Sequence, residues 1–280
     1  MYRGITFIFL ILCISISNAQ THRFIYEYKF IPDSTKTDNL ITENTRLEIF
    51  NDHSEFLSEL IAKKDSANFS NKKQSNHNIA NLPEGKFKNK VYKSENYVYT
   101  LEYIGIQPFK VIQNEKIIWK LINENKQING YNCQKAITKY GKRIWEAWFT
   151  QEIPIQNGPY VFGNLPGLII ELSDTKMQHH FLLVENYKTT NEESNFKDSP
   201  YLPSSTVNPL QFNSKWKIYA KNPLGGMEQF MILNPGLLTG ESFDKDGNKI
   251  DNQKRLIEER NYAKKELNEN NNYINLELYQ

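Results

Sequence analysis

The sequence predicts a mainly β protein: an antiparallel meander sheet, curved or half-barrel in shape, with two or three short helices covering it. One reason is composition, because 16 Tyr, 16 Phe and 4 Trp favour pleated sheet. A second is the alternation over residues 22–30, which places Phe24, Tyr26 and Tyr28 on one face of a strand. A third is the close spacing of the strand-like segments, because parallel neighbours need crossovers of a dozen or more residues.

The N-terminal segment has the pattern of a signal peptide. Arg3 precedes an apolar run from Ile5 to Ile16, and Ser17-Asn18-Ala19 supplies the small residues of a cleavage site. The run is shorter than the roughly 20 residues of a membrane-spanning helix. We therefore predict a signal peptide over residues 1–19, export to the periplasm or secretion, and no transmembrane segment after cleavage.

The length of 280 residues favours one large domain over two equal ones. We predict a single β-rich domain over residues 20–280. Residues 65–89 are rich in Asn, Ser and Lys and predict a mobile insertion, and residues 189–208 predict a second long loop. No internal repeat is visible.

Charge and cysteine content narrow the partners. Removing residues 1–19 removes Arg3 from 34 Lys+Arg, which leaves 33 against 32 Asp+Glu and a formal charge of +1. This balance argues against nucleic acid as a partner. Cys133 is the one cysteine left, so an internal disulfide is excluded. His179 and His180 are adjacent in a strand and point to opposite faces, so we predict no metal and no cofactor.

The first third of the chain predicts a hairpin followed by a helix. Residues 22–30 and 40–50 form the two strands of the hairpin. Asp52 then precedes apolar residues at helical spacing, which predicts a helix over residues 54–61. Short strands over residues 98–103, 109–111 and 117–121 continue the meander.

The central third predicts two further hairpins. Residues 126–140 and 143–150 form strands joined at Gly141-Lys142, and the prolines of residues 153–166 predict a rigid irregular connection. Residues 167–173 and 178–185 form the next hairpin. If its turn holds Asp174 to Met177, Glu171 lies directly opposite His180.

The last third predicts helices over residues 209–221 and 253–268. Pro209 suits the first turn of the former, with Leu210, Trp216 and Tyr219 as candidates for its buried side. Residues 243–250 predict a hairpin on an Asp-Gly turn, and residues 273–278 a terminal strand.

The central stretch resembles the GLPGLI family of exported bacterial proteins, named for a Gly-Leu-Pro-Gly-Leu-Ile signature. Its matching segments are Gly130-Tyr131, residues 133–136, 147–150, 153–154 and 158–160, and the signature at residues 164–169. The first Gly is replaced by Asn164, and Asn tolerates positive φ best among non-glycine residues, so we predict a left-handed backbone there. The resemblance implies export and a shared β-rich fold. The strand order is also similar to the half-barrels of periplasmic lipoprotein carriers.

The leading functional hypothesis is a non-enzymatic exported protein that binds an apolar ligand or an envelope partner such as an outer-membrane protein. Aromatic residues beside a rigid Pro-Gly loop suit such a site, although aromatic strands also pack simply as core. The candidate residues are Trp145, Trp148, Tyr160, Phe162, Asn164, Pro166 and Gly167.

Two alternatives belong to other functional classes. A hydrolase would use Glu171 with His180 as an acid/base pair, or Cys133 as nucleophile. The competing interpretations are an exposed ion pair and a buried structural thiol. The third hypothesis is a structural adaptor of the cell envelope, whose charged C-terminal helix docks on another protein.

Overall fold

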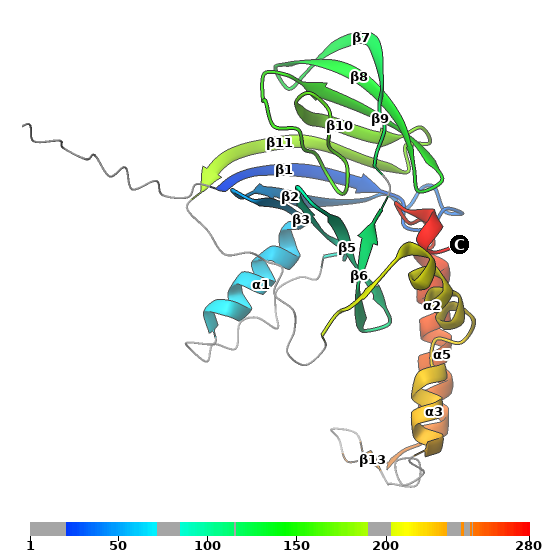
Figure 1. Cartoon of the computed structure of the whole chain (residues 1–280). Coiled ribbons are helices and arrows are strands. Elements are labelled where there is room, and N and C mark those ends of the chain that lie inside the picture. The colour runs from blue at the N-terminus through cyan, green and yellow to red at the C-terminus, as the bar shows by residue number, and fades with distance from the viewer. Residues whose placement is uncertain are drawn as a thin grey trace, which may run out of the picture.

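The computed structural model describes residues 21–71, 85–114, 116–189, 203–233, 242–243, 247 and 249–280. Its centre is one open, curved 12-stranded sheet in the order β12-β6-β5-β4-β3-β2-β1-β11-β10-β9-β8-β7 (Figure 1). The strands are β1 (Thr21–Phe30), β2 (Ile41–Ile49), β3 (His53–Ser58), β4 (Lys90–Ser94), β5 (Val98–Ile104), β6 (Gln107–Gln113), β7 (Lys120–Ile128), β8 (Tyr131–Tyr140), β9 (Arg143–Thr150), β10 (Leu168–Asp174), β11 (His179–Thr189) and β12 (Ser205–Val207). The predicted fold class is confirmed.

The sheet consists of two antiparallel meanders, β1–β6 and β7–β11, joined where β1 pairs with β11. The short β12 adds to β6 in parallel. A continuous meander through residues 98–121 is therefore wrong, because β7 pairs with β8 and not with β6. The cause is a turn at Asn129-Gly130, where φ is 49° and 87°. An Asn-Gly pair favours a two-residue hairpin, and the single strand expected over residues 126–140 is wrong for the same reason.

The side chains of β1 alternate between the two faces of the sheet, as predicted. Phe24, Tyr26 and Tyr28 are at most 2% exposed and point to what we call the core face. The Tyr28 ring stacks on Phe181 of β11 at 4.0 Å between centroids, and the Tyr26 hydroxyl donates to the Ile169 carbonyl at 2.7 Å. The side chains that alternate with them along β1 point to the opposite face of the sheet, which we call the outer face. The hairpin of β1 and β2 is also confirmed.

The helix expected over residues 54–61 begins later. Residues 53–58 are strand β3, paired with β2 on one side and β4 on the other. Phe56 and Leu57 are fully buried on opposite faces, which a strand between two neighbours permits. Ser58 then caps helix α1 (Glu59–Asn71) by accepting the Leu60 backbone N–H. The helix runs into the predicted insertion, whose residues 72–84 lie outside the described part.

The connection over residues 153–166 is irregular, as predicted, and it folds onto the core face. Its Tyr160 and Phe162 are buried in the main core. The Lys93 ammonium donates to the carbonyls of Gly158 (2.8 Å) and Phe162 (3.0 Å), and the Trp119 indole donates to Gly163 (2.8 Å). Burial lowers the pKa of Lys93. The connection is thus fixed by side chains that satisfy its backbone.

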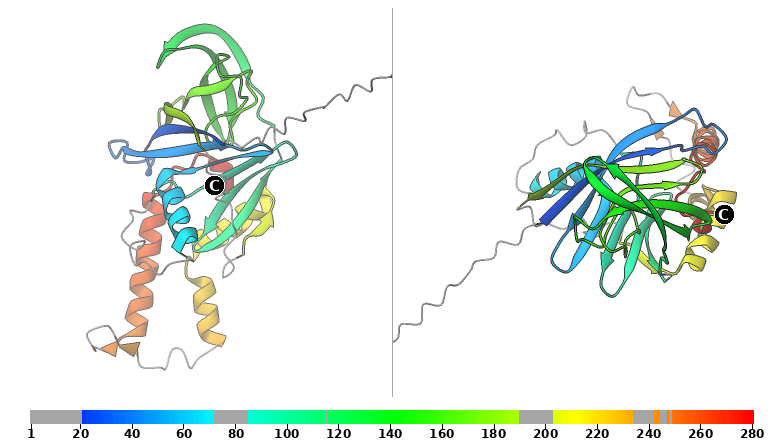
Figure 2. Two further views of the ribbon diagram at one scale, coloured as in Figure 1. Left: turned by 90° about the vertical axis from the view of Figure 1, so that its left-hand side faces the viewer. Right: turned by 90° about the horizontal axis from the view of Figure 1, so that it is seen from above.

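The C-terminal part forms an arm beside the sheet. Helix α2 (Pro209–Lys221) is confirmed, with Asn208 as N-cap, and buries Phe212 and Trp216. The expectation that Leu210 lies on the buried side is wrong, because it is 80% exposed. Helices α3 (Gly225–Leu233) and α5 (Asn252–Glu269) project away from the sheet (Figures 1 and 2), joined by an ion pair between Glu228 and Arg260.

The final residues are not a strand. Residues 276–278 form the 3-10 helix η2 (Leu276–Leu278). The Trp216 indole donates to the Tyr279 carbonyl at 3.1 Å, and this contact to α2 replaces sheet pairing. The expected hairpin over residues 243–250 is represented by β13 (Ser242–Phe243) and β14 (Lys249–Ile250), which pair antiparallel.

Two expected segments lie wholly or mainly outside the described residues: the signal peptide over 1–19 and the loop over 189–208. Among the described helices, none combines the length and the apolar character needed to cross a membrane.

Candidate functional site

The outer face of β8–β11 brings together the polar residues singled out from the sequence. Trp148 of β9 lies directly opposite Lys135 of β8 and Glu171 of β10. Residues opposite each other across an antiparallel pair point to the same face. The half-buried Trp148 therefore stands between a cation and an anion on an open sheet surface.

Two further side chains complete this group. The Lys126 ammonium lies 4.3 Å from the centroid of the Trp148 ring and 2.6 Å from Glu171 Oε2. His180 Nε2 lies 2.9 Å from Glu171 Oε1. Lys135 lies 5.7 Å from the same ring. We call Lys126, Lys135, Trp148, Glu171 and His180 the Trp148 cluster.

The hydrogen bond between Glu171 and His180 forms diagonally. Directly opposite pairing of these residues is wrong, because Glu171 lies opposite Leu182 and Ser173 opposite His180. Asp174 belongs to β10, and its side chain accepts hydrogen bonds from the backbone N–H groups of Gln178 and His179. The turn therefore spans residues 175–178 and not residues 174–177. A register change of two keeps every side chain on its face, so the two residues still meet.

The Glu171 carboxylate is stabilised in its charged form. The hydrogen bond from His180, together with Lys126, lowers the pKa of Glu171 to about 2. Each carboxylate oxygen already has a partner, one in His180 and the other in Lys126. Such a group holds a charge in place, but it is poorly matched to proton transfer near neutral pH.

Cys133 of β8 lies directly opposite Lys126, on the same face of the sheet as this cluster. Its side chain is 1% exposed, and its thiol points to the Tyr131 carbonyl at 3.6 Å. Burial, followed by the nearby Glu152, raises the pKa of the Cys133 thiol to about 11. A nucleophilic cysteine requires the opposite change, because the thiolate is the reactive form.

The aromatic residues of the predicted site do not lie on one accessible surface. Trp145, Tyr160 and Phe162 are at most 2% exposed, and the rings of Trp145 and Phe162 pack at 4.8 Å. These three rings are core side chains, so a ligand in solvent does not reach them. Of the aromatic residues proposed, Trp148 is the one that remains partly exposed.

The Pro-Gly loop has the backbone that its sequence predicts. Asn164 has φ of 63°, which confirms the left-handed conformation. Gly167 has φ of 153°, and a Cβ atom there would collide with the Thr150 carbonyl oxygen. Asn164 and Pro166 are exposed while Leu165 is buried, so the loop is anchored in the core and presents its polar residue to solvent.

Lys126 and Lys135 were missed in the sequence, although a signal for both exists. A two-residue turn at Gly141-Lys142 places Tyr140 opposite Arg143, and counting back along both strands places Lys135 opposite Trp148. The same count from the Asn129-Gly130 turn places Lys126 opposite Cys133. Register counting from tight turns would therefore have identified both cations.

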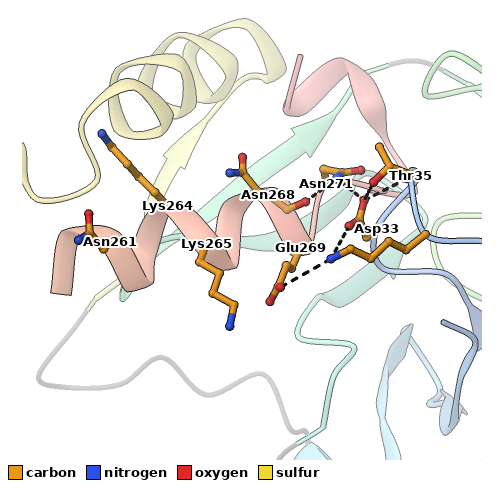
Figure 3. Close-up of a pocket in the computed structure, with 9 residues that line it drawn as sticks. Asp33, Thr35, Asn261, Lys264, Lys265, Asn268, Glu269 and Asn271 are labelled. Atoms are coloured by element: carbon orange, nitrogen blue, oxygen red, sulfur yellow. Dashed lines mark hydrogen bonds and ion pairs between the residues drawn. The ribbon is translucent and has the colours of Figure 1, made fainter. Parts of the chain in front are cut away.

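A polar hollow of about 640 Å³ lies where α5 meets the turn between β1 and β2 (Figure 3). At one end of the hollow, Asp33 accepts hydrogen bonds from Thr35 and from Asn271, and the Lys36 ammonium lies 3.4 Å from its carboxylate. The bonds from Thr35 lower the pKa of Asp33. This network attaches the C-terminal end of α5 to the turn.

No metal centre emerges in the part of the chain that the structure describes, where no three His, Cys, Asp or Glu side chains are grouped to hold an ion.

Residues 49–201, more than half of the chain, match the family described as N-glycanase peptide, N-terminal domain. No curated protein matches the chain. The resemblance to the GLPGLI family and to lipoprotein carriers stays a prediction.

Three solved structures are similar in part. Crystal structures of PNGF-II in space groups P21 and C2 are 17% and 18% identical, each with a TM-score of 0.47 over 70% of this chain. The match covers 33% and 32% of those chains, so this chain spans about a third of their length. An uncharacterised conserved protein from Thermus thermophilus is 10% identical, with a TM-score of 0.34 over 69% of this chain and 91% of its own.

Proposed function

The chain belongs to the family of the N-glycanase peptide N-terminal domain, and from this premise we propose that it is a non-catalytic, exported recognition module that binds carbohydrate. The family name points to proteins that act on N-linked glycans. The binding surface that we propose is the Trp148 cluster.

One observation supports the proposal most directly: a partly exposed indole on an open sheet face, surrounded by charged hydrogen-bonding groups. A sugar ring has an apolar C–H face and a rim of hydroxyls. An amphipathic aromatic side chain can cover the former, while fixed polar groups orient the latter. Lys126, Lys135 and Glu171 supply both donors and acceptors around the ring.

We favour carbohydrate over the apolar ligand expected from the sequence. An apolar ligand needs several aromatic walls, and three of the four aromatic candidates are in the core. The surface that remains has one ring and four ionisable neighbours. A polyhydroxylated ligand matches that ratio of apolar to polar groups better.

The hydrolase hypothesis has less support. The pKa of Glu171 is lowered to about 2, which suits a fixed charge and not proton transfer near neutral pH, and the pKa of the Cys133 thiol is raised to about 11. The adaptor hypothesis stays a prediction: α5 exposes Ile257 and Tyr262, but nothing in the described residues indicates what would cover them.

The test is binding of a neutral N-glycan, released from glycoprotein, to the full chain. We expect Trp148→Ala to weaken binding about two- to tenfold, taking the roughly 0.5–1.5 kcal/mol of an aromatic pair as the guide for a ring packed on a sugar face. The matched control is Tyr262→Ala, which removes an exposed ring on α5. Equal affinity of wild type and Trp148→Ala would refute the assigned site, and the absence of binding by wild type would refute the function.

A further inference from the structure

A second concave site lies on the outer face of the sheet, between α1 and the strands β1, β2 and β11. Its volume is about 600 Å³, within the range of small-ligand pockets, roughly 300–1,000 Å³. Glu59 and Lys63 of α1 form one wall, and Glu185 and Tyr187 of β11 form the other. The hollow is separate from the Trp148 cluster and contains none of its residues.

The floor of this hollow is a network of buried charges. Arg23 and Arg46 are 9% and 4% exposed, and Glu48 beneath them is 1% exposed. Arg23 donates through Nε to Glu48 Oε1 at 2.9 Å, and Arg46 donates through Nε to Glu59. Arg46 Nη1 lies 3.8 Å from Glu48, too far for a hydrogen bond. The two guanidinium groups are therefore fixed in place by the carboxylates to which they donate.

The charges around the hollow cancel. Three cations, Arg23, Arg46 and Lys63, face three anions, Glu48, Glu59 and Glu185. Lys63 lies 3.4 Å from Glu59, so it is also paired. A simple anion or cation gains little from a site of balanced charge, whereas a neutral ligand with many hydroxyls can use donors and acceptors together.

The wall formed by Tyr187 adds an apolar surface. Tyr187 is 40% exposed, and its hydroxyl accepts a hydrogen bond from Arg23 Nη1 at 3.4 Å. Arg23 also lies 5.7 Å from the ring centroid, which holds the ring in place. An immobilised, partly exposed ring beside fixed polar groups repeats the chemistry of the Trp148 cluster.

From this geometry we infer that the hollow between α1 and β11 is a second binding site for a neutral saccharide unit. The inference extends the proposed function and rests on it. Strand β11 links the two sites, because His180 and Tyr187 lie seven residues apart on it, roughly 23 Å at about 3.3 Å per residue. One monosaccharide cannot span that distance, so a single ligand would reach both sites only as a branched or extended oligosaccharide.

The test uses the full chain and the neutral disaccharide N,N′-diacetylchitobiose, followed by chemical-shift changes of backbone amides. We expect two separate groups of amides to respond, one around Trp148 and one around Asn44 and Tyr187. Tyr187→Ala should weaken binding at the second group about tenfold and leave the first unchanged. Asn44→Trp, which places a large side chain in the hollow at an exposed position of β2, should abolish the second response.

The outcomes separate the two proposals. Tyr97→Ala is the matched control, because Tyr97 is a similarly exposed tyrosine (48%) on the turn between β4 and β5. A response around Trp148 alone, or one around the hollow that survives both substitutions, would overturn the second site and leave the first. A response confined to the hollow would overturn the Trp148 site. Displacement of the disaccharide by inorganic phosphate would show an anion site and overturn the inference.

Discussion

The clearest stability prediction concerns Glu102, a carboxyl group enclosed between the sheet and the C-terminal residues. It is 0% exposed, and its Oε2 accepts hydrogen bonds from Asn89 and from the Tyr279 hydroxyl. The neighbouring titratable groups are all tyrosines: Tyr103, Tyr140, Tyr160, Tyr273 and Tyr279. Within the described residues no Lys or Arg forms an ion pair with Glu102. Burial raises the pKa of Glu102 to about 7.

The sign of the effect follows from the proton balance. The folded protein holds a proton on Glu102 that the unfolded chain releases near pH 4.5. The contribution to stability is therefore complete below pH 4.5 and is lost as the pH rises through about 7. The difference between the two pKa values corresponds to roughly 3 kcal/mol of unfolding free energy.

Urea unfolding at a series of pH values measures this directly. Trp216 is a suitable fluorescent reporter, because its ring packs on Tyr279 at 4.8 Å between centroids. We expect wild type to lose about 3 kcal/mol relative to Glu102→Gln between pH 4.5 and pH 8. Buried His179, whose pKa is lowered by burial, acts in the opposite direction, but it is present in both proteins and cancels in the difference.

The matched control is Glu277→Gln, which removes an exposed carboxylate from the same C-terminal segment. Its stability curve should run parallel to that of wild type. If the curves of wild type and Glu102→Gln are also parallel, Glu102 ionises in the folded protein at an ordinary pH and the reasoning from burial fails.

Three further predictions concern the central stretch. Because Asn164 has φ of 63°, Asn164→Gly should change the unfolding free energy by no more than about 0.5 kcal/mol, while Asn164→Val should lower it by about 1–2 kcal/mol. Urea titration of the two variants measures both differences. Gly167→Ala should abolish the cooperative thermal transition seen by circular dichroism, because its Cβ would collide with the Thr150 carbonyl; a normal transition would contradict this. Cys133 should resist a thiol reagent at pH 8 until denaturant is added, since its thiol is buried and its pKa is raised to about 11; rapid labelling of the native protein would contradict this.

The parts of the fold that sequence patterns predicted are those specified by neighbouring residues. The alternation of Phe24, Tyr26 and Tyr28 fixed the core face of β1, and the turn at Gly141-Lys142 fixed the hairpin of β8 and β9. The left-handed backbone of Asn164 also follows from a local preference. Each of these features needs information from only a few adjacent residues.

The errors arose where two local signals competed. Residues 54–61 have apolar side chains at helical spacing, but Phe56 and Leu57 gain more by filling both faces of a strand between β2 and β4. Periodicity over so short a segment does not separate the two structures. At Asn129-Gly130 a turn signal competes with the long run of strand-forming residues around it, and the turn determines the structure.

The two proposed sites differ in how far the sequence can specify them, and the difference has a physical cause. In the Trp148 cluster, the tight turns at residues 129–130 and 141–142 set the registers that bring Lys126 and Trp148 to one face. The turn at residues 175–178 brings Glu171 and His180 together, and these two halves meet through the pairing of β9 with β10 across the irregular connection of residues 153–166. The second hollow needs Arg23 beside Tyr187, 164 residues later in the chain. That contact depends on the pairing of β1 with β11, which closes the longest loop in the sheet. The entropy cost of closing this loop is not offset until most of the chain is ordered. No turn specifies it, and contacts on the opposite face favour that register, among them the stacked rings of Tyr28 and Phe181 and the hydrogen bond between the Tyr28 hydroxyl and His179. The core face therefore determines whether the outer-face hollow exists at all.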